Sequence, residues 1–253
     1  MKNPAMQPVQ QAFLAFFTLL TLQAPPANAD FAGLNIGVNH WAPDLTGSFN
    51  STNSTSIDLT SDLAINDPSQ TSLVLILEHP IPVLPNVKYQ NYDLETSGSS
   101  TLNRIIQFNG QSYGPANGQI SSTFDLSHDD IVLYYEILDN WLSLDLGVDI
   151  KRFNGEVGIS GNNITIDEIV PLLHISARAD LPFSGFYIGA DLNYLSSGDN
   201  SGNDSTLLIG YESNIGLGIE GGIKSFNLEL DDADNVDTDI EYEGIYLNGF
   251  YHF

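Results

Sequence analysis

The strongest constraint on the fold is a period of two in the hydrophobic residues, which recurs along most of the chain. Near the C-terminus, large apolar or small residues stand at every odd position from Ile245 to Phe253, the last residue. Because successive side chains of a strand point to opposite faces, this pattern predicts a strand with one apolar face. A chain built from such segments is expected to be all-β.

The clearest hairpin is centred on Asp139-Asn140. Apolar residues hold alternate positions in 131–137 and again in 142–150. A two-residue turn would pair Tyr135 with Leu144 and would place both apolar sets on one face of the hairpin. A soluble β-sandwich, with its apolar side chains turned to a core, could produce the same pattern.

The same alternation predicts ten strands, and the connections between them alternate between short and long. The strands are expected near 32–41, 72–79, 86–96, 122–138, 141–153, 172–180, 185–195, 205–213, 217–230 and 236–253. The long connections are 42–71, 97–121, 154–171 and 196–204. Short periplasmic turns with longer extracellular loops are the rule for outer-membrane barrels, and a sandwich gives no reason for them. We therefore predict an antiparallel up-and-down transmembrane barrel of about ten strands, with eight or 12 as alternatives.

Two smaller features agree with this barrel. Prolines such as Pro43 and Pro115 fall in the predicted connections, where a missing N–H does little harm. Aromatic residues near the strand ends are expected to form two girdles at the membrane interfaces. They are Trp41 and Tyr194 at one end, and Trp141, Phe186 and Phe253 at the other.

The N-terminus predicts export. Lys2 is followed by an apolar run of about 11 residues, too short for a bilayer-spanning helix, which needs about 20. Ala27-Asn28-Ala29 has the small-residue pattern of a signal peptidase site. We expect residues 1–29 to be a cleaved signal peptide and residues 30–253 to form one outer-membrane β-barrel domain. Lipid offers no partners to unpaired backbone groups, so such a chain can enter a membrane only as a closed barrel.

Composition narrows the possible partners. The formal net charge of −25 opposes binding to nucleic acid phosphates. The chain has no cysteine, so a disulfide scaffold is excluded. Acidic residues cluster in 196–204 and 231–239 among Ser, Asn, Gly and Thr, and these segments are expected to be solvated loops.

Charged residues within the predicted strands fall on the parity opposite to the apolar one, so we expect them to line the barrel interior. Clustered carboxylates in a confined space need neutralising cations, and we expect a lumen closed by ion pairs and hydrogen bonds. Ten strands should leave little or no pore, because open porins use about 16 to 18. The predicted lumen network is Glu78, Lys88, Glu136, Asp145, Asp149, Lys151, Arg178, Asp191, Glu212, Glu220 and Lys224.

Several stretches of the chain resemble a known family. They are Leu77-Glu78-His79-Pro80-Ile81-Pro82 with Leu84-Pro85-Asn86, Leu126-Ser127-His128, Leu133-Tyr134-Tyr135-Glu136-Ile137-Leu138-Asp139-Asn140-Trp141 with Ser143-Leu144-Asp145-Leu146-Gly147, and the terminal Tyr251-His252-Phe253. Together they resemble a family of small proteobacterial outer-membrane β-barrel proteins of unassigned function. The resemblance covers the mature chain and implies its fold and location. It brings no catalytic or binding residues, and the Ser/Thr/Asn-rich segment 48–56 departs from it.

Some outer-membrane barrels are enzymes, and ten-stranded surface proteases with His and Asp near the extracellular rim are the sharpest comparison. Here the candidates are His40, His128, Asp129 and Asp130, of which His128 and Asp130 share one face of a strand. A general base needs a positioned nucleophile, and no motif supplies one. We therefore favour a polar strand end at the water interface and predict no enzymatic activity.

Two further sites are weighed against plainer interpretations. His174 is expected on the interior face, opposite Asp191 if the hairpin tip lies near Pro182-Phe183, and we favour a structural histidine. The acidic segment offers oxygen ligands for calcium, but it lacks the glycine and the terminal glutamate of an EF-hand loop. We favour a solvated loop there, with a weak metal candidate in Asp231, Asp232, Asp234, Asp237 and Asp239.

The sequence thus predicts a monomeric, non-enzymatic barrel in the outer membrane, with a structural or binding role in the cell envelope. A narrow small-solute channel and a hydrolase sited at the rim are the alternatives. Expected partners are outer-membrane lipid, lipopolysaccharide and the barrel-assembly machinery, for which Leu247, Tyr251 and Phe253 form a C-terminal assembly signal. No cofactor and no nucleic acid are expected.

Overall fold

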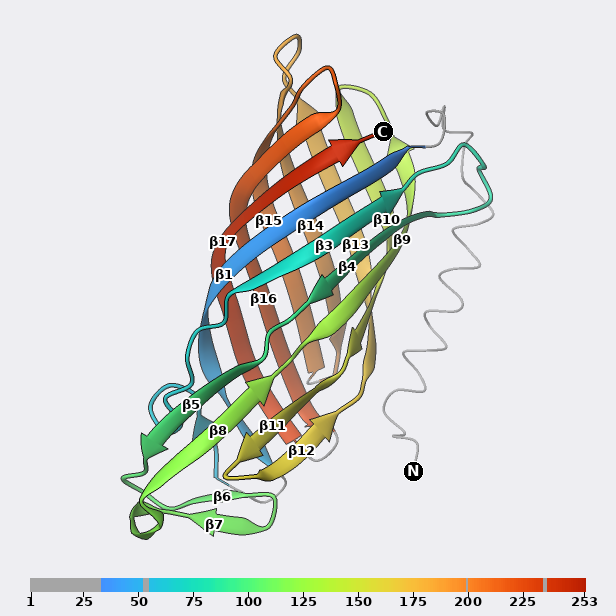
Figure 1. The fold of residues 1–253 in the computed structure, drawn as a ribbon. Helices are drawn as coiled ribbons and strands as arrows, with labels where there is room; N and C mark the ends of the chain where they lie inside the picture. The colour runs from blue at the N-terminus through green and yellow to red at the C-terminus, as the bar shows by residue number, and fades with distance from the viewer. Residues whose placement is uncertain (1–32, 52–54, 199, 234–235) are drawn as a thin grey trace.

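In the computed structural model, ten strands close into an antiparallel barrel (Figure 1). The structure describes residues 33–51, 55–198, 200–233 and 236–253, so the predicted signal peptide and cleavage site lie outside the described residues. The barrel strands are β1 Leu34–Ser51, β3 Gln70–Leu77, β4 Asn86–Tyr92, β9 His128–Leu138, β10 Leu142–Phe153, β13 Ile169–Asp180, β14 Phe186–Ser197, β15 Asn200–Glu212, β16 Leu217–Ala233 and β17 Val236–His252. Pairing of β17 with β1 closes the wall. The predicted ten-stranded barrel is confirmed.

The outer face of the barrel carries a broad apolar band near the short-turn end. On β17, Ile245 is 67 % exposed and Leu247 is 50 % exposed, and Ile219 and Ile223 continue the band on β16. An exposed apolar surface that runs over neighbouring strands suits hydrocarbon rather than water. In the part of the chain that the structure describes, no helix is both long and apolar enough to span a membrane.

The strands continue beyond this band, and there the pattern of the two faces inverts. On β16 the outward residues change from Ile223 to Ser225 and Asn227, while the inward residues change from Lys224 to the buried Phe226. Below the band, toward the long loops, the wall is therefore polar outside and apolar inside, as in a water-soluble β protein.

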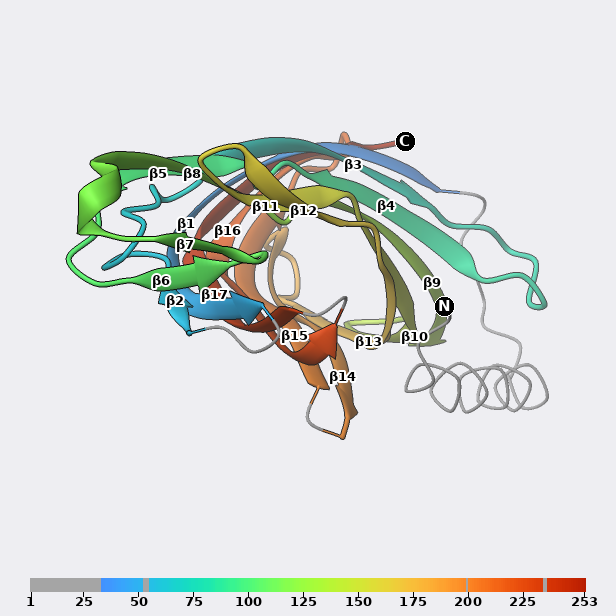
Figure 2. The same ribbon diagram turned by 90° about the horizontal axis from the view of Figure 1, so that it is seen from below.

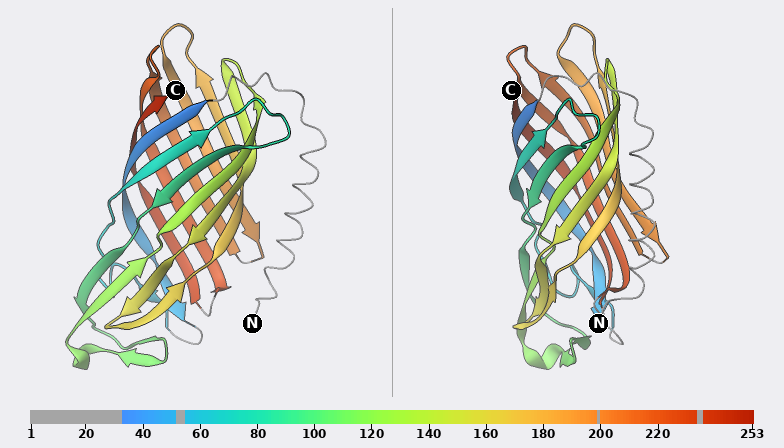
Figure 3. Two further views of the ribbon diagram at one scale, coloured as in Figure 1. Left: turned by 45° about the vertical axis from the view of Figure 1, so that its right-hand side comes forward. Right: turned by 90° about the vertical axis from the view of Figure 1, so that its right-hand side faces the viewer.

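The long connections form a second β structure at that end, here called the loop module, which comprises residues 55–69, 93–127 and 154–168. It projects from the barrel end, as two side views show (Figure 3). Its elements are β2 Ile57–Asp58, β5 Thr96–Thr101, β6 Ile106–Phe108, β7 Gln111–Tyr113, the short 3-10 helix η1 Pro115–Asn117, β8 Gln119–Asp125, β11 Gly155–Ile159 and β12 Asn162–Ile166. β5, β8, β11 and β12 form one sheet, and β6 pairs with β7 (Figure 2).

A hydrophobic core holds the loop module together and continues into the barrel end. Phe49 of β1 is buried and packs its ring against Phe108 and Phe124, with ring centroids 5.8 and 6.0 Å apart. The Arg104 guanidinium donates to the buried Asp62 and holds the pKa of that carboxyl below its usual value. The segments predicted as long connections in this region therefore contain short strands and a buried core of their own.

The acidic segments 196–204 and 231–239 also differ from the prediction. The β14 and β15 strands extend to Ser197 and from Asn200, and β16 and β17 extend to Ala233 and from Val236. These segments are mainly strand ends rather than loops, since their backbones continue the ladders of the barrel wall.

Three local predictions are wrong. Pro43 lies inside β1 and points to the interior, and the predicted strand 122–138 is two strands, β8 and β9. The central hairpin pairs Tyr135 with Leu146 instead of Leu144, because its turn is longer and a β-bulge lies between Leu144 and Asp145. The shift of two residues keeps Tyr135 and Leu146 on their predicted face, whereas the bulge places Leu138 opposite Leu144.

Candidate functional site

The interior of the barrel contains a cavity of about 370 Å³ near the short-turn end, here called the polar cup. Solvent reaches it at Arg178 and Asp180, whose side chains are 37 % and 38 % exposed. Eight residues of the predicted lumen network line it, namely Glu78, Lys88, Glu136, Asp145, Arg178, Asp191, Glu212 and Glu220. The charged side chains on the inward faces of these strands thus line one cavity.

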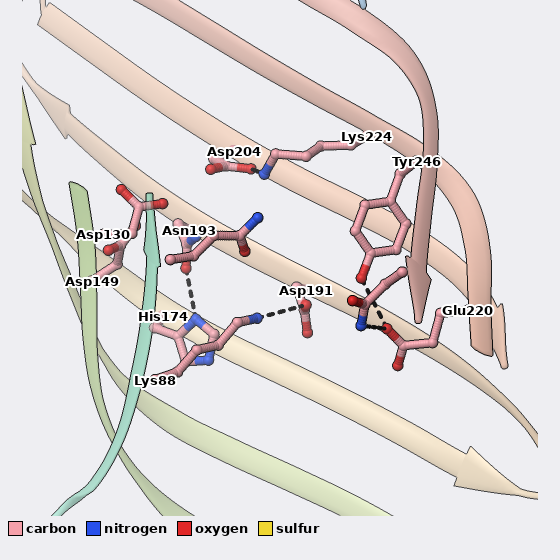
Figure 4. Close-up of polar contacts among 12 residues, drawn as sticks. Lys88, Asp130, Asp149, His174, Asp191, Asn193, Asp204, Glu220, Lys224 and Tyr246 are labelled. Carbon is pink, nitrogen blue, oxygen red and sulfur yellow. Dashed lines mark hydrogen bonds and ion pairs between the residues drawn. The ribbon is translucent and has the colours of Figure 1, made fainter. Parts of the chain in front are cut away.

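The other three network residues lie deeper, in a buried set of charges here called the ion layer, of which Figure 4 labels Asp130, Asp149, Asp204 and Lys224. It consists of Asp130, Asp149, Lys151, Asp204 and Lys224, each at most 5 % exposed. The Lys151 Nζ lies 2.6 Å from Asp130 Oδ2, 2.8 Å from Asp204 Oδ2 and 3.4 Å from Asp149 Oδ2. Lys224 pairs with the other oxygen of Asp204. Lys151 lies on β10 and Asp204 on β15, and two strands separate them in the wall. The contact between Lys151 and Asp204 therefore crosses the lumen.

The carboxylates of Asp130, Asp149 and Asp204 present oxygens within 4.8 Å of one another, a spacing that could hold a metal ion. The ammonium of Lys151 already contacts all three. It supplies the positive charge that a metal would otherwise provide, and removing it would leave buried carboxylates undercompensated.

Below the ion layer, six rings fill the barrel, and we call them the aromatic plug. They are Trp41, Tyr92, His128, Phe153, Phe226 and Tyr242, all at most 6 % exposed. The His128 ring lies between those of Tyr92 and Phe226, with centroids 4.7 and 5.5 Å away. The Lys224 Nζ lies 5.1 Å from the Tyr92 ring centroid, so the cations of the ion layer rest on aromatic faces.

The aromatic plug was missed from the sequence. Trp41 was expected in an outer girdle, but it is fully buried and points inward. The error follows from the inversion of the two faces. Inward side chains are polar at the level of the apolar band, and they are apolar nearer the long loops. The other predicted girdle residues, Tyr194, Trp141, Phe186 and Phe253, are exposed at 47–67 %.

Within the polar cup, ion pairs and hydrogen bonds hold several groups across the lumen. Lys88 of β4 pairs with Asp191 of β14 at 3.6 Å (Figure 4). Arg178 contacts Asp180 at 2.9 Å and Glu212 at 3.5 Å. A smaller recess of about 30 Å³ shares Lys88 and Asp191 with the cup and extends toward the ion layer.

Glu220 is the most heavily hydrogen-bonded carboxylate of the cup. It accepts from the Tyr187 hydroxyl at 2.7 Å, the Tyr246 hydroxyl at 2.9 Å and the Asn248 Nδ2 at 2.9 Å. Tyr187 lies over Gly210, where a Cβ would sit 2.2 Å from the ring Cζ. The sequence prediction did not include these donors, although the inward parity of Tyr246 and Asn248 could have identified them.

The structure does not assemble the candidate hydrolase residues. His40 is exposed on the outer face and contacts Thr71, whereas His128 is buried in the aromatic plug. The His128 Nε2 lies 3.7 Å from Asp130 Oδ1, and Asp130 forms an ion pair with Lys151. Asp129 accepts a hydrogen bond from Tyr89 at 2.7 Å.

The predicted partner of His174 is wrong. His174 lies opposite Asn193 in the β13–β14 ladder, and its Nδ1 is 2.6 Å from Asn193 Oδ1. Asp191 lies opposite Ser176. The turn is centred about one residue later than expected, which shifts the pairing by two residues while keeping the faces.

The weak metal candidate is only partly described. Asp234 lies outside the described residues, and the side chains of Asp231 and Asp232 are likewise not described. Asp237 accepts from Asn50 Nδ2 at 2.6 Å, and Asp239 points outward. In the described part of the chain these aspartates form no convergent metal-binding group.

The three residues of the predicted assembly signal all face outward. Leu247, Tyr251 and Phe253 are 50 %, 40 % and 67 % exposed, and the last two rings pack 4.6 Å apart. Their recognition by the assembly machinery stays a prediction.

No protein-family model matches the chain, and no curated protein sequence matches it. The predicted membership of a proteobacterial family therefore stays a prediction. Among solved structures, the outer-membrane protease OmpT of Escherichia coli is similar over 91 % of this chain and 100 % of its own, with 10 % identity and a TM-score of 0.50. Ail of Yersinia pestis matches 88 % of this chain and 99 % of its own, with 10 % identity and a TM-score of 0.35. OprG of Pseudomonas aeruginosa matches 90 % of this chain and 98 % of its own, with 8 % identity and a TM-score of 0.29. At such identity, the similarity to OmpT establishes the fold alone: that of an outer-membrane β-barrel.

Proposed function

We propose that this protein is a non-enzymatic, monomeric outer-membrane barrel with a plugged lumen, whose loop module has a structural or binding role at the cell surface. The aromatic plug is the observation that carries the proposal. A channel needs a continuous polar path, and six buried rings from six strands lie across the lumen instead. Lipid and lipopolysaccharide would surround the apolar band, and the C-terminal strand would direct assembly.

The loop module supports the binding role. Its core and paired strands fix the shape of an exposed surface, whereas flexible loops would lose entropy on meeting a partner. Rigid presentation of side chains is what a recognition surface requires.

Conductance in planar bilayers tests the proposal. The pure folded protein is expected to give no steady conductance, whereas the double variant Phe153→Ala and Phe226→Ala should conduct, because it removes two rings from the plug. Ile223→Ala, a truncation on the lipid-facing side of the same β16 strand, is the matched control and should stay silent. Large, stable conductance from the unaltered protein would favour the narrow-channel alternative.

The hydrolase alternative draws on the OmpT fold only. Incubation of the purified protein with a mixed peptide library should give no cleavage, because His40 lies on the outer face, whereas His128 and Asp130 are buried inside the barrel. Cleavage that disappears in His40→Ala, with the barrel still folded by heat-modifiable electrophoresis, would overturn the non-enzymatic assignment.

A further inference from the structure

The polar cup has a large excess of negative charge. Eight carboxylate residues line it, against Lys88 and Arg178 as permanent cations. The confined, low-dielectric walls strengthen the field of these carboxylates and favour the entry of a positive ligand from the open end.

Two buried acceptors in the cup have no donor. The Oδ1 of Asp145 is shielded from solvent and has no hydrogen-bond partner, and the same holds for the Oδ1 of Asn248. Asn248 is only 7 % exposed, and its Nδ2 is fixed by the hydrogen bond to Glu220, which rules out the flipped amide. An unpaired buried acceptor is costly, so both oxygens would gain from an N–H donor.

The spacing of the carboxylates discriminates between kinds of cation. In the described part of the chain, the convergent group that could hold a metal is the one in the ion layer, where Lys151 already lies. The carboxylates of the cup form no such group, so they suit a ligand with several separated charges rather than one ion. Val74, Ile76, Leu208 and Phe250 also line the cup and would contact methylene groups.

We propose that the polar cup binds a linear organic polyamine, which enters from the short-turn end. Its ammonium groups would pair with the carboxylates and donate to Asp145, while its methylene segments would lie against the apolar part of the lining. The binding is reversible and involves no covalent step.

Titration calorimetry with spermidine on the full-length protein in detergent tests this proposal. At about 0.15 M salt, where exposed charges are screened, we expect one saturable site. Asp145→Asn should weaken binding about tenfold, because it removes one charge-assisted hydrogen bond. Ser143→Lys, which places a cation at the cup lining, should weaken binding by at least as much. Glu243→Gln, the same loss of charge on the outer wall, is the matched control and should leave binding unchanged.

Heat-modifiable electrophoresis verifies that each variant is folded, and Ser143→Lys decides the test if Asp145→Asn does not fold. The proposal is overturned by an absence of saturable binding, by an equal effect of Glu243→Gln, or by Mg²⁺ competing as well as spermidine does. The conductance test of the plugged lumen is independent of all three results.

The β3–β4 turn supports a separate inference about the membrane. Its residues Ile81, Val83 and Leu84 are 52 %, 75 % and 53 % exposed, and the sequence has no Asp, Glu, Lys or Arg between Glu78 and Lys88. The turn extends sideways from the wall at the short-turn end of the barrel, as Figure 1 shows. The Tyr135 hydroxyl, from the outer face of β9, donates to the Val83 carbonyl at 3.1 Å and holds the turn there.

We infer that this turn enters the lipid leaflet on the short-turn side and anchors the barrel at that interface. Its three prolines lack N–H groups, which reduces the number of backbone donors that lipid would leave unpaired. Apolar side chains continuous with the lipid-facing band would gain by leaving water.

The absence of cysteine allows a clean spin-label test in lipid vesicles. A nitroxide at Val83→Cys should be more accessible to oxygen than to a polar nickel complex, whereas one at Asp139→Cys, in the neighbouring β9–β10 turn, should show the reverse. Equal accessibility of the two labels to the nickel complex would overturn the inference.

Discussion

The two halves of the barrel interior are built from the same strands but follow opposite rules. In the turn half, β16 and β17 point Glu220 and Asn248 into a hollow polar cup, whereas in the loop half they point Phe226 and Tyr242 into a packed plug. The outer face changes in the opposite sense at the same level. The difference teaches that the solvent outside each half decides what the inside must be, since one face of a sheet has to be apolar where the other meets water.

The largest expected effect comes from the layer between the halves. Lys151→Ala should destabilise the barrel by about 3–5 kcal/mol, because it leaves three buried carboxylates with less compensation. Urea unfolding in lipid vesicles measures the change. Lys88→Ala is the control, since that side chain is 27 % exposed and has one partner at 3.6 Å, and its effect should be much smaller. Equal losses would mean that the ion layer is no more essential than the polar cup.

Truncation of the plug tests whether the loop half is a true core. Phe226→Ala should cost about 3–5 kcal/mol, because it opens a cavity in packed surroundings. Ile223→Ala, three residues away on the lipid-facing side of β16, should destabilise the protein less, since lipid can fill the space. The comparison, made by the same unfolding measurement, fails if the two losses are equal.

A charge scan down one strand locates the level at which the faces invert. Leu247→Lys places a cation in the apolar band and should destabilise by about 2–4 kcal/mol. Glu241→Lys, six residues away on the same outward face of β17, should change stability little because its site is expected to be in water. Destabilisation of similar size at both positions would remove the boundary between Ile245 and Glu243, which pair with Ile223 and Ser225 at the inversion on β16.

The smallest expected effect concerns acid and the loop module. Because Arg104 lowers the pKa of Asp62 in the folded state, the pair stabilises the module above the ordinary Asp pKa of 3.8. That contribution is lost as the pH falls through the lowered value. With Arg104 41 % exposed, we expect about 1 kcal/mol. The protection factors of residues 58–66 against hydrogen exchange should fall in acid, and Asp62→Asn should lower them already at pH 7. Unchanged exchange in that variant would show that the pair is not stabilising.

Much of the wall could be predicted from sequence, because within the apolar band each strand carries an unambiguous period of two. Both register errors, at Tyr135 and at His174, shifted the pairing by two residues and left the faces of these two residues correct. Turn length alone sets such shifts, and a bulge such as that at Leu144 and Asp145 has no clear sequence signal. The predicted outward position of Trp41 was wrong because apolar residues were assumed to face outward along the whole strand, whereas they face inward beyond the apolar band.

The sequence by itself determined about ten wall strands and, within the apolar band, which of their side chains face inward, because lipid and lumen impose opposite polarity on alternate residues. Only the tertiary structure decided which inward groups meet. Lys151 reaches Asp204 across the lumen from a strand that is not its neighbour, and Phe226 packs on His128 in the same way. Barrel closure sets these contacts, and alternation along a single strand carries no information about the opposite wall.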